Sequence, residues 1–295
     1  TNRMYSIISV YFMSNQIKPV LSLMSDLIIN PVYPSKIIKD RIINEKKSFL
    51  INLERLSVQS SRLIKQTLYG CDHPYGRTIT ASDFENIKTE DLINFHTDIY
   101  NSDNIEIVIS GDFFEDIIDL ADFYFSKINV SSPNYISREE NVFNKNKNIL
   151  LPPFCSAQSI YLSKNNALQT AFRIAKILPG PKHIDFLSLR ILVTIFGGYF
   201  GSRLMTNIRE EKGYTYGIGA YLVVEENYSE LHIVTEVGEK YTKLVLDEII
   251  KEIEKLKNID LSDEELEKVK AYLLGSLLHS CDGIFNQAIL FRNLK

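Results

Sequence analysis

Two side chains in the second half of the sequence could act together on a carbonyl group. Arg209 and Tyr216 are seven residues apart, within the glycine-punctuated stretch Phe196–Ala220. A guanidinium offers a fork of hydrogen-bond donors and a phenol adds one more, so the pair could hold a peptide carbonyl or stabilise an oxyanion. The residues alone favour a plainer interpretation, in which the arginine pairs with Glu210 or Glu211 at the surface and the tyrosine packs in a sheet.

Other catalytic patterns are missing from the sequence. The five histidines are His73, His96, His183, His232 and His279. No two of them have the spacing of an HExxH or HxxEH zinc motif, so the chain as given cannot assemble a zincin-type site from its own residues. No serine lies in a GxSxG elbow, no GxxxxGK[ST] phosphate loop occurs, and the glycines between positions 213 and 219 do not fit the dinucleotide pattern.

Glu45, in the run NEKKSF, is the third residue that we single out. A helix glutamate among lysines ordinarily makes i,i+4 pairs on a solvated face. The residues alone therefore favour a surface role for Glu45.

The elements that must position these residues follow from hydrophobic periodicity. In the first half, β-branched and alternating residues predict strands at Tyr5–Met13 and Asn104–Ser110. The helices predicted there are Ile17–Ile29, a long helix from Pro34-Ser35 through KIIKDRIINEKKSFLINLERL, a further helix ending at Tyr69-Gly70, Thr89–Tyr100 and Glu115–Lys127.

The second half repeats this order of elements. Strands are predicted at Ser159–Leu162 and Gln169–Lys176, followed by a hairpin of Gly217–Val224 with Ser229–Glu236. The predicted helices are His183–Phe196, Lys240–Lys257 and a helix capped by Ser262 with Glu265. We therefore predict an α+β fold of two related domains, residues 1–145 and 146–295, each a mainly antiparallel β-sheet packed with α-helices. The polar, Asn-rich stretch Asn129–Pro153 contains the predicted boundary.

Composition excludes several classes of protein. The net charge of -4 and the pI near 5.8 give no electrostatic reason to bind nucleic acid. Three cysteines far apart fit neither a disulfide framework nor a CxxC metal site. No apolar run approaches the roughly 20 residues that cross a bilayer, so membrane insertion is not expected.

The stretch FGGYFGSRLMTNIREEKGYTYGIGA resembles the second-domain signature of the M16 family, the pitrilysin-like and mitochondrial-processing-peptidase-like zinc peptidases. That signature reads G-G-x-x-x-S-R-L and then R-E-x-x-G-x-x-Y. The flanking segments QTAFRIAK and LSDEELEKVKAYLLGSL are similar to the same family. The resemblance implies that Arg209 and Tyr216 grip the substrate backbone beside a zinc ion. Tyr214 is the alternative phenol, less favoured because its side chain should point to a different side of the strand from its neighbour's.

The first half resembles the M16 first domain from just downstream of its HxxEH motif. PVYPSKIIKDRIINEKKSFLINL is similar to the helix that carries the third zinc ligand, and HPYG and EDLINFHTDIYNSDNIEIVISGD follow it. By this alignment Glu45 falls on the zinc-ligand glutamate, whereas Asn52 replaces the acidic residue expected at its position. The HxxEH segment itself would lie upstream of Thr1.

The resemblance implies a part in zinc-dependent peptide hydrolysis. The chain would supply substrate binding and oxyanion stabilisation, and it is expected to be inactive alone. It most resembles the bacterial half-length M16 proteins, of the cytoplasm or periplasm, that lack the motif and pair with an active subunit. The implied partners are a peptide substrate and either an HxxEH-bearing M16 subunit or a second copy of the chain, unless a missing segment carries HxxEH. The alternative is a non-catalytic structural subunit of a larger assembly.

Overall fold

The chain divides into two compact units. The structure, a computed structural model, describes residues 6–113, 116–128, 159–162, 164, 167–225 and 227–294. The first unit consists of Thr1–Ile43, Asn86–Ile136 and Ser276–Lys295, and the second of Asn44–Glu85 and Ser137–Gly275. The predicted boundary between residues 145 and 146 lies outside the described residues.

The predicted helices are confirmed, with ends within a few residues of those expected. In the first half they are α1 (Ile17–Ile29), α2 (Ser35–Leu53), α3 (Leu56–Tyr69), α5 (Thr89–Ile99) and α6 (Ile117–Phe125). A short helix that periodicity did not predict, α4 (Ala81–Asn86), precedes α5. In the second half they are α8 (Phe186–Val193), α9 (Thr242–Asn258) and α10 (Asp263–Cys281), and α11 (Gly283–Leu294) follows. The predicted cap of α10 is present, because the backbone N–H of Glu265 donates to Ser262 Oγ at 3.2 Å.

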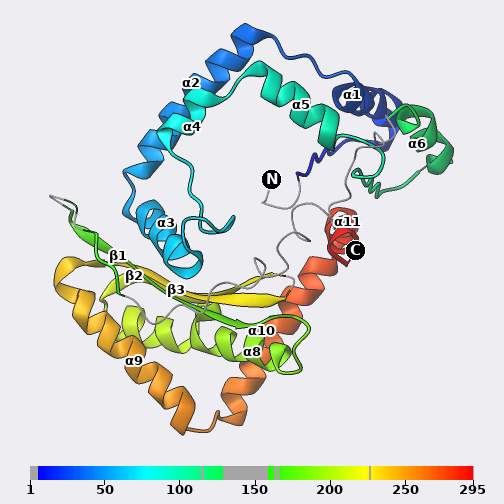
Figure 1. The fold of residues 1–295 in the computed structure, drawn as a ribbon. Coiled ribbons are helices and arrows are strands. Elements are labelled where there is room, and N and C mark those ends of the chain that lie inside the picture. The colour runs from blue at the N-terminus through cyan, green and yellow to red at the C-terminus, as the bar shows by residue number, and fades with distance from the viewer. Residues whose placement is uncertain are drawn as a thin grey trace. The chain divides into compact units, whose positions relative to one another are not determined.

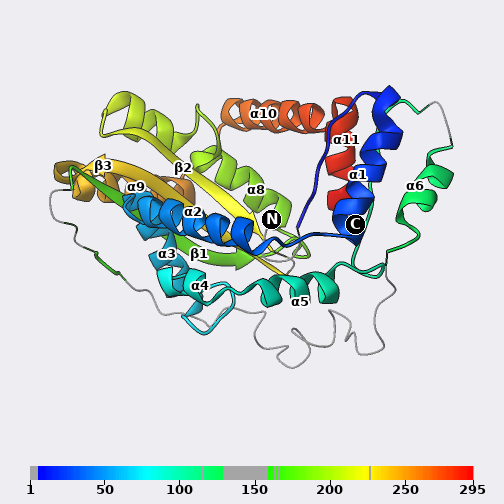
Figure 2. The same ribbon diagram turned by 90° about the horizontal axis from the view of Figure 1, so that it is seen from above.

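The first unit is held together by a small helical core. Leu21 and Ile28 of α1 and Phe125 of α6 are buried against one another. The two helices lie side by side in both views (Figure 1 and Figure 2). Within the described residues, no helix of either unit combines the length and the apolar character that crossing a membrane requires.

Three of the predicted strands are wrong. The described residues of Tyr5–Met13, of Asn104–Ser110 and of Ser159–Leu162 form no strand. Alternation shows only which side chains are buried, whereas a strand also needs a partner row of backbone groups, and no described segment pairs with these three. Ile105 and Ile109 of the second segment instead pack against the core of the first unit.

The sheet of the described residues lies in the second unit and has three antiparallel strands. They are β1 (Gln169–Pro179), β2 (Thr215–Val224) and β3 (Tyr228–Gly238), in the order β1-β3-β2. The predicted hairpin is confirmed, since Val224 of β2 pairs with Ser229 of β3. The prediction of an α+β fold with an antiparallel sheet is therefore confirmed.

One face of this sheet carries the core of the second unit. Ile218, Ile233 and Val237 are at most 5% exposed and pack against buried side chains of the helical segments, among them Leu204 and Ile249. Figure 1 shows α8 and α9 on this side of the sheet and α3 on the other. The second face, which α3 covers in part, is thus the one that stays accessible.

A buried polar cluster fastens α3 to the second face. The phenol of Tyr69, at the end of α3, donates a hydrogen bond to the Glu230 carboxylate, and His232 Nε2 lies 2.7 Å from the other carboxylate oxygen. All three residues are at most 4% exposed, and His232 also stacks on Tyr221 of β2. Burial raises the pKa of the Glu230 carboxyl, but the hydrogen bonds from His232 and Tyr69 outweigh it and leave that pKa below its usual value.

A bidentate ion pair joins the residues before β2 to α10. Arg203 Nε and Nη2 donate to the two carboxylate oxygens of Glu265, each at 2.7 Å. The hydrogen bonds from Arg203 hold the pKa of the Glu265 carboxyl below its usual value, although partial burial opposes them. Arg203 lies between Ser202 and Leu204, which are both fully buried. The burial of its neighbours fixes the backbone from which Arg203 reaches Glu265.

Replacing Arg203 by alanine is expected to lower the free energy of unfolding by about 2 kcal/mol, because two charge-assisted hydrogen bonds are lost. Chemical denaturation followed by circular dichroism measures this change. Lys268→Ala, which removes an exposed i,i+4 pair with Glu264 on the same helix, is the control and should leave the denaturation midpoint where it is. Equal midpoints for the Arg203 variant and the wild type would show that the pair contributes nothing.

Candidate functional site

The stretch that leads to the site is packed closely against β2. Phe196, Leu204 and Ile208 are at most 4% exposed and belong to the core of the second unit. A Cβ atom on Gly197 would lie 2.5 Å from the backbone nitrogen of Ala220, so only glycine fits where this segment crosses the strand. This close approach fixes the distance between the segment and β2.

Arg209 lies on a π-helix, η3 (Met205–Glu211), which follows a shorter π-helical segment, η2 (Thr194–Gly198). The hydrogen bonds of a π-helix span five residues in place of four, as the bond from Lys212 N–H to the Asn207 carbonyl shows. The guanidinium carbon lies 4.8 Å from the centre of the Phe200 ring, a cation–π contact. The ring therefore holds the guanidinium plane in place.

Arg209 and Tyr216 are brought together through the backbone. Arg209 Nε donates to the carbonyl oxygen of Tyr216 at 3.0 Å. The predicted surface pairing of Arg209 with Glu210 is present as a long contact of 3.8 Å between Nη1 and Oε1. The Tyr216 side chain is 93% exposed and does not pack in the sheet, which removes the plainer interpretation of this residue.

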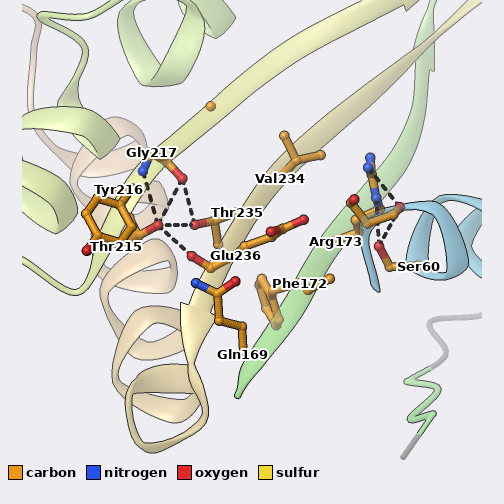
Figure 3. A pocket seen from close by; sticks show the side chains of 13 residues that line it. Ser60, Gln169, Phe172, Arg173, Thr215, Tyr216, Gly217, Val234, Thr235 and Glu236 are labelled. Carbon is orange, nitrogen blue, oxygen red and sulfur yellow. Dashed lines mark hydrogen bonds between the residues drawn. The ribbon is translucent and has the colours of Figure 1, made fainter. Parts of the chain in front are cut away.

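A β-bulge turns Tyr216 away from the core. Thr215 pairs with Val237 and Ile218 with Thr235, so two residues of β2 stand opposite one residue of β3. Hydroxyl groups hold the bulge: Thr215 Oγ1 donates to the carbonyl of Glu236 at 2.7 Å and accepts from Thr235 Oγ1 at 3.0 Å (Figure 3). The phenol of Tyr216 is thus presented from a rigid backbone.

Tyr214 has a different environment from Tyr216. Its ring stacks on Tyr241 with 4.9 Å between ring centres and packs against the core of the second unit. It is not among the residues that line the cavity described next. The structure therefore brings Tyr216, and not the alternative Tyr214, to an open site.

A cavity of about 470 Å³ lies beside Tyr216 on the second face of the sheet. Its floor is formed by Ala171, Gly219 and Val234, one from each strand, and Ser57 and Ser60 of α3 form one wall. Figure 3 shows Thr215 and Tyr216 at one end and Arg173 with Ser60 at the other. The cavity combines an apolar floor with a few polar groups at its rim, as ligand sites do.

Glu45 lies on an exposed side of α2 and does not line the cavity. In the part of the chain that the structure describes, no three His, Cys, Asp or Glu side chains form a group that could hold a metal ion. Because a catalytic zinc needs about three protein ligands, these residues do not fit the ion. A zinc role for Glu45 remains a prediction that depends on ligands outside the described residues.

Sequence reasoning missed the polar residues of the cavity other than Tyr216. Arg173 on β1 and Glu236 on β3 reach the same cavity because Ala171 pairs with Glu236 and Arg173 with Val234. Alternation along each strand assigns these residues to one face, but the register between the strands cannot be read from either strand alone.

The family comparison covers most of the chain. A family model described as "Peptidase M16 inactive domain" matches residues 86–273. This range contains Arg209, Tyr216 and the three strands, and it ends within α10.

The relatives found among curated proteins are distant and longer. An uncharacterized zinc protease of Rickettsia felis is 22% identical over 277 residues, which are 90% of this chain and 61% of that protein. The mitochondrial-processing peptidase subunit beta of Saccharomyces cerevisiae is 26% identical over 231 residues, 72% of this chain and 47% of that subunit. The chain thus spans about half to three fifths of the length of these relatives.

Among solved structures, a protease from Helicobacter pylori has the same fold. The TM-score is 0.72 at 16% sequence identity, and the match covers 95% of this chain and 67% of that one. An identity this low indicates a shared fold only.

Proposed function

Since the chain belongs to the peptidase M16 inactive domain family, we propose that its second unit binds a peptide substrate and stabilises the oxyanion that forms during peptide hydrolysis. One observation carries the proposal. Arg209 holds the backbone of Tyr216 while the Tyr216 phenol remains exposed at the end of a cavity of about 470 Å³. The Tyr216 phenol is a hydrogen-bond donor with a fixed backbone and an exposed hydroxyl, which suits a ligand carbonyl.

The two residues have distinct parts in this proposal. When water attacks a peptide carbonyl carbon, the carbonyl oxygen gains negative charge, and the Tyr216 O–H donates a hydrogen bond to it. Arg209 uses Nε to hold Tyr216, and its terminal nitrogens add positive charge beside the same oxygen. Donors fixed in advance stabilise the transition state without the cost of reorienting them.

The metal-binding part of the reaction belongs elsewhere in this proposal. The chain itself contains no HxxEH sequence, and the matching family model is that of the inactive domain. An HxxEH-bearing M16 subunit, or a segment beyond the present sequence, would supply that part. In this proposal the protein is a substrate-binding partner in proteolysis, and it would not cleave peptides alone.

Tyr216→Phe, in the full-length protein combined with an HxxEH-bearing M16 partner, is expected to lower kcat/KM for an internally quenched peptide by about 10²–10³-fold, because one oxyanion donor is lost. Arg209→Ala is expected to have a loss of similar size, since it releases Tyr216. Steady-state fluorescence kinetics measure both effects.

Tyr214→Phe is the matched control, because it removes a phenol O–H two residues away whose ring is packed on Tyr241. It should leave kcat/KM unchanged. If Tyr216→Phe and Arg209→Ala also leave it unchanged, the substrate-binding role is wrong. Copurification with a large assembly, together with the absence of peptide binding, would instead identify a structural subunit.

A further inference from the structure

One basic side chain that lines the cavity, Arg173, has no part in the proposed function. Arg173 lies at the end of the cavity opposite Tyr216, next to the first turn of α3 (Figure 3). Of the residues that line the cavity, Arg173 is the one basic side chain and Glu236 the one acidic side chain. Neither makes an ion pair with any residue in the described ranges.

Two hydrogen bonds orient the guanidinium of Arg173. Nε donates to Ser60 Oγ at 3.0 Å, and Nη2 donates to the backbone carbonyl of Ser57 at 3.3 Å. Both acceptors belong to α3, so the helix holds one edge of the planar group. The other edge, with both hydrogens of Nη1 and the second hydrogen of Nη2, has no partner among the described residues.

The free edge has the geometry that a carboxylate needs. Two parallel N–H donors on one guanidinium edge bind both oxygens of a carboxylate at once, which gives a stronger and more directional contact than a lysine can make. The orientation is fixed before a ligand arrives, so little side-chain entropy is lost on binding.

The surroundings favour a single negative charge. Ser57 and Ser60 lie in the first turns of α3, at the end of a helix that carries partial positive charge. Glu236 pairs with Ala171 and Arg173 with Val234, so the two charged residues are diagonal neighbours on one sheet face, about 7–8 Å apart at Cα. The Glu236 carboxylate would repel a doubly charged anion such as phosphate more strongly than a singly charged one.

We propose that the cavity binds a carboxylate of the peptide substrate, with the free edge of Arg173 as its fork and Tyr216 at the opposite end. This inference rests on the proposed function, because it names the class of peptide that the same site prefers. The carboxylate comes from an aspartate or glutamate side chain or from the C-terminus of the peptide. Glu236 weakens the contact and so limits it to peptides that also engage the rest of the cavity.

Binding of three fluorescent peptides of equal length to the full-length protein tests the proposal. The first has one glutamate and an amidated C-terminus, the second has glutamine in its place, and the third has glutamine and a free C-terminal acid. We expect the first or the third to bind about tenfold more tightly than the second, as for a charge-assisted hydrogen-bonded pair. Which of the two does so identifies the source of the carboxylate.

Variants then assign the preference to named residues. Arg173→Gln should abolish the preference for the carboxylate peptide over the neutral one, and Arg173→Lys should restore part of that preference. Glu236→Gln should increase this preference, because it removes the negative charge that repels the ligand carboxylate and alters no contact of α3. Circular dichroism checks the folding of each variant, and the Glu236 result stands by itself if Arg173→Gln does not fold.

Three results would overturn the proposal: equal affinities for the three peptides, a preference that survives in Arg173→Gln, or a preference that falls in Glu236→Gln. The last result, with tighter binding of a lysine-containing peptide, would show that Glu236 selects cations. Failure of the proposed function is distinguishable, because it would appear as unchanged cleavage in Tyr216→Phe whatever the peptide preference.

Discussion

A protein with alanine in place of Gly197 is expected to lose about 3 kcal/mol of unfolding free energy, the upper end of the range for overpacked interiors. The added Cβ would lie 2.5 Å from the backbone nitrogen and 2.6 Å from the Cβ of Ala220, which is 2% exposed in the middle of β2. Backbone atoms of a paired strand cannot move aside as a flexible side chain can. The segment before Arg209 would therefore be pushed off the sheet.

Gly198 provides the control, since it is the other half of the glycine pair. A Cβ there would meet only the side chain of Thr194, at 3.3 Å, which can shift by a few tenths of an ångström. Gly198→Ala should therefore cost under about 1 kcal/mol. Urea denaturation followed by far-UV circular dichroism compares the two variants, and equal midpoints would contradict the close approach at Gly197.

Glu230→Gln is expected to destabilise the second unit by about 3 kcal/mol. The substitution removes the charge from a carboxylate that is 4% exposed and accepts hydrogen bonds from both Tyr69 and His232. Breaking one partner of such a buried group leaves the others unsatisfied, which costs more than the loss of a surface pair. His232 Nδ1 has no hydrogen-bond partner among the described residues, so within them the imidazole is held by its contact with Glu230.

Glu236→Gln is the matched control for this experiment, because it makes the same change on the same strand at an exposed position. It should leave the denaturation midpoint unchanged. A Glu230 variant as stable as the wild type would show that the buried cluster does not fasten α3.

The same cluster predicts an acid-sensitive contribution to stability. Because the pKa of Glu230 is lower in the folded state than its ordinary value of 4.5, the stabilisation is fully present above about pH 4.5 and is lost as the pH falls through the folded pKa. The wild type should therefore lose stability below pH 4.5 by more than Glu230→Gln does. Parallel pH curves for the two proteins would contradict this assignment.

Helices were predictable because each carries its own evidence. The apolar spacing of Ile17–Ile29 predicts α1 with both ends correct, and Ser262 with Glu265 predicts the start of α10. The β2–β3 hairpin was predictable for the same reason, since its two strands are adjacent in the sequence and alternate clearly. Helices and hairpins of this kind are determined by a few consecutive residues.

Features that depend on distant partners were not predictable. Asn104–Ser110 alternates as well as β2 does, yet it forms no strand because no described segment pairs with it. Arg209 and Tyr216 were singled out by residue type, but their spacing alone favoured a surface role, and only the family resemblance favoured a site there. The orientation of Arg173 could not be predicted, because it is held by Ser57 and Ser60, which are more than 110 residues away in the chain.

The pair of Arg209 and Tyr216 depends on residue number as much as on residue type. One extra residue in the π-helix η3 sets the direction of Arg209, and one extra residue in the bulge between Thr215 and Ile218 turns Tyr216 outward. Deleting a residue from the first would rotate Arg209 by about 100°, and deleting one from the second would move Tyr216 to the opposite face. Over evolutionary time this segment should therefore accept many substitutions, whereas insertions and deletions between Asn207 and Ile218 should be almost absent from relatives that still use the pair.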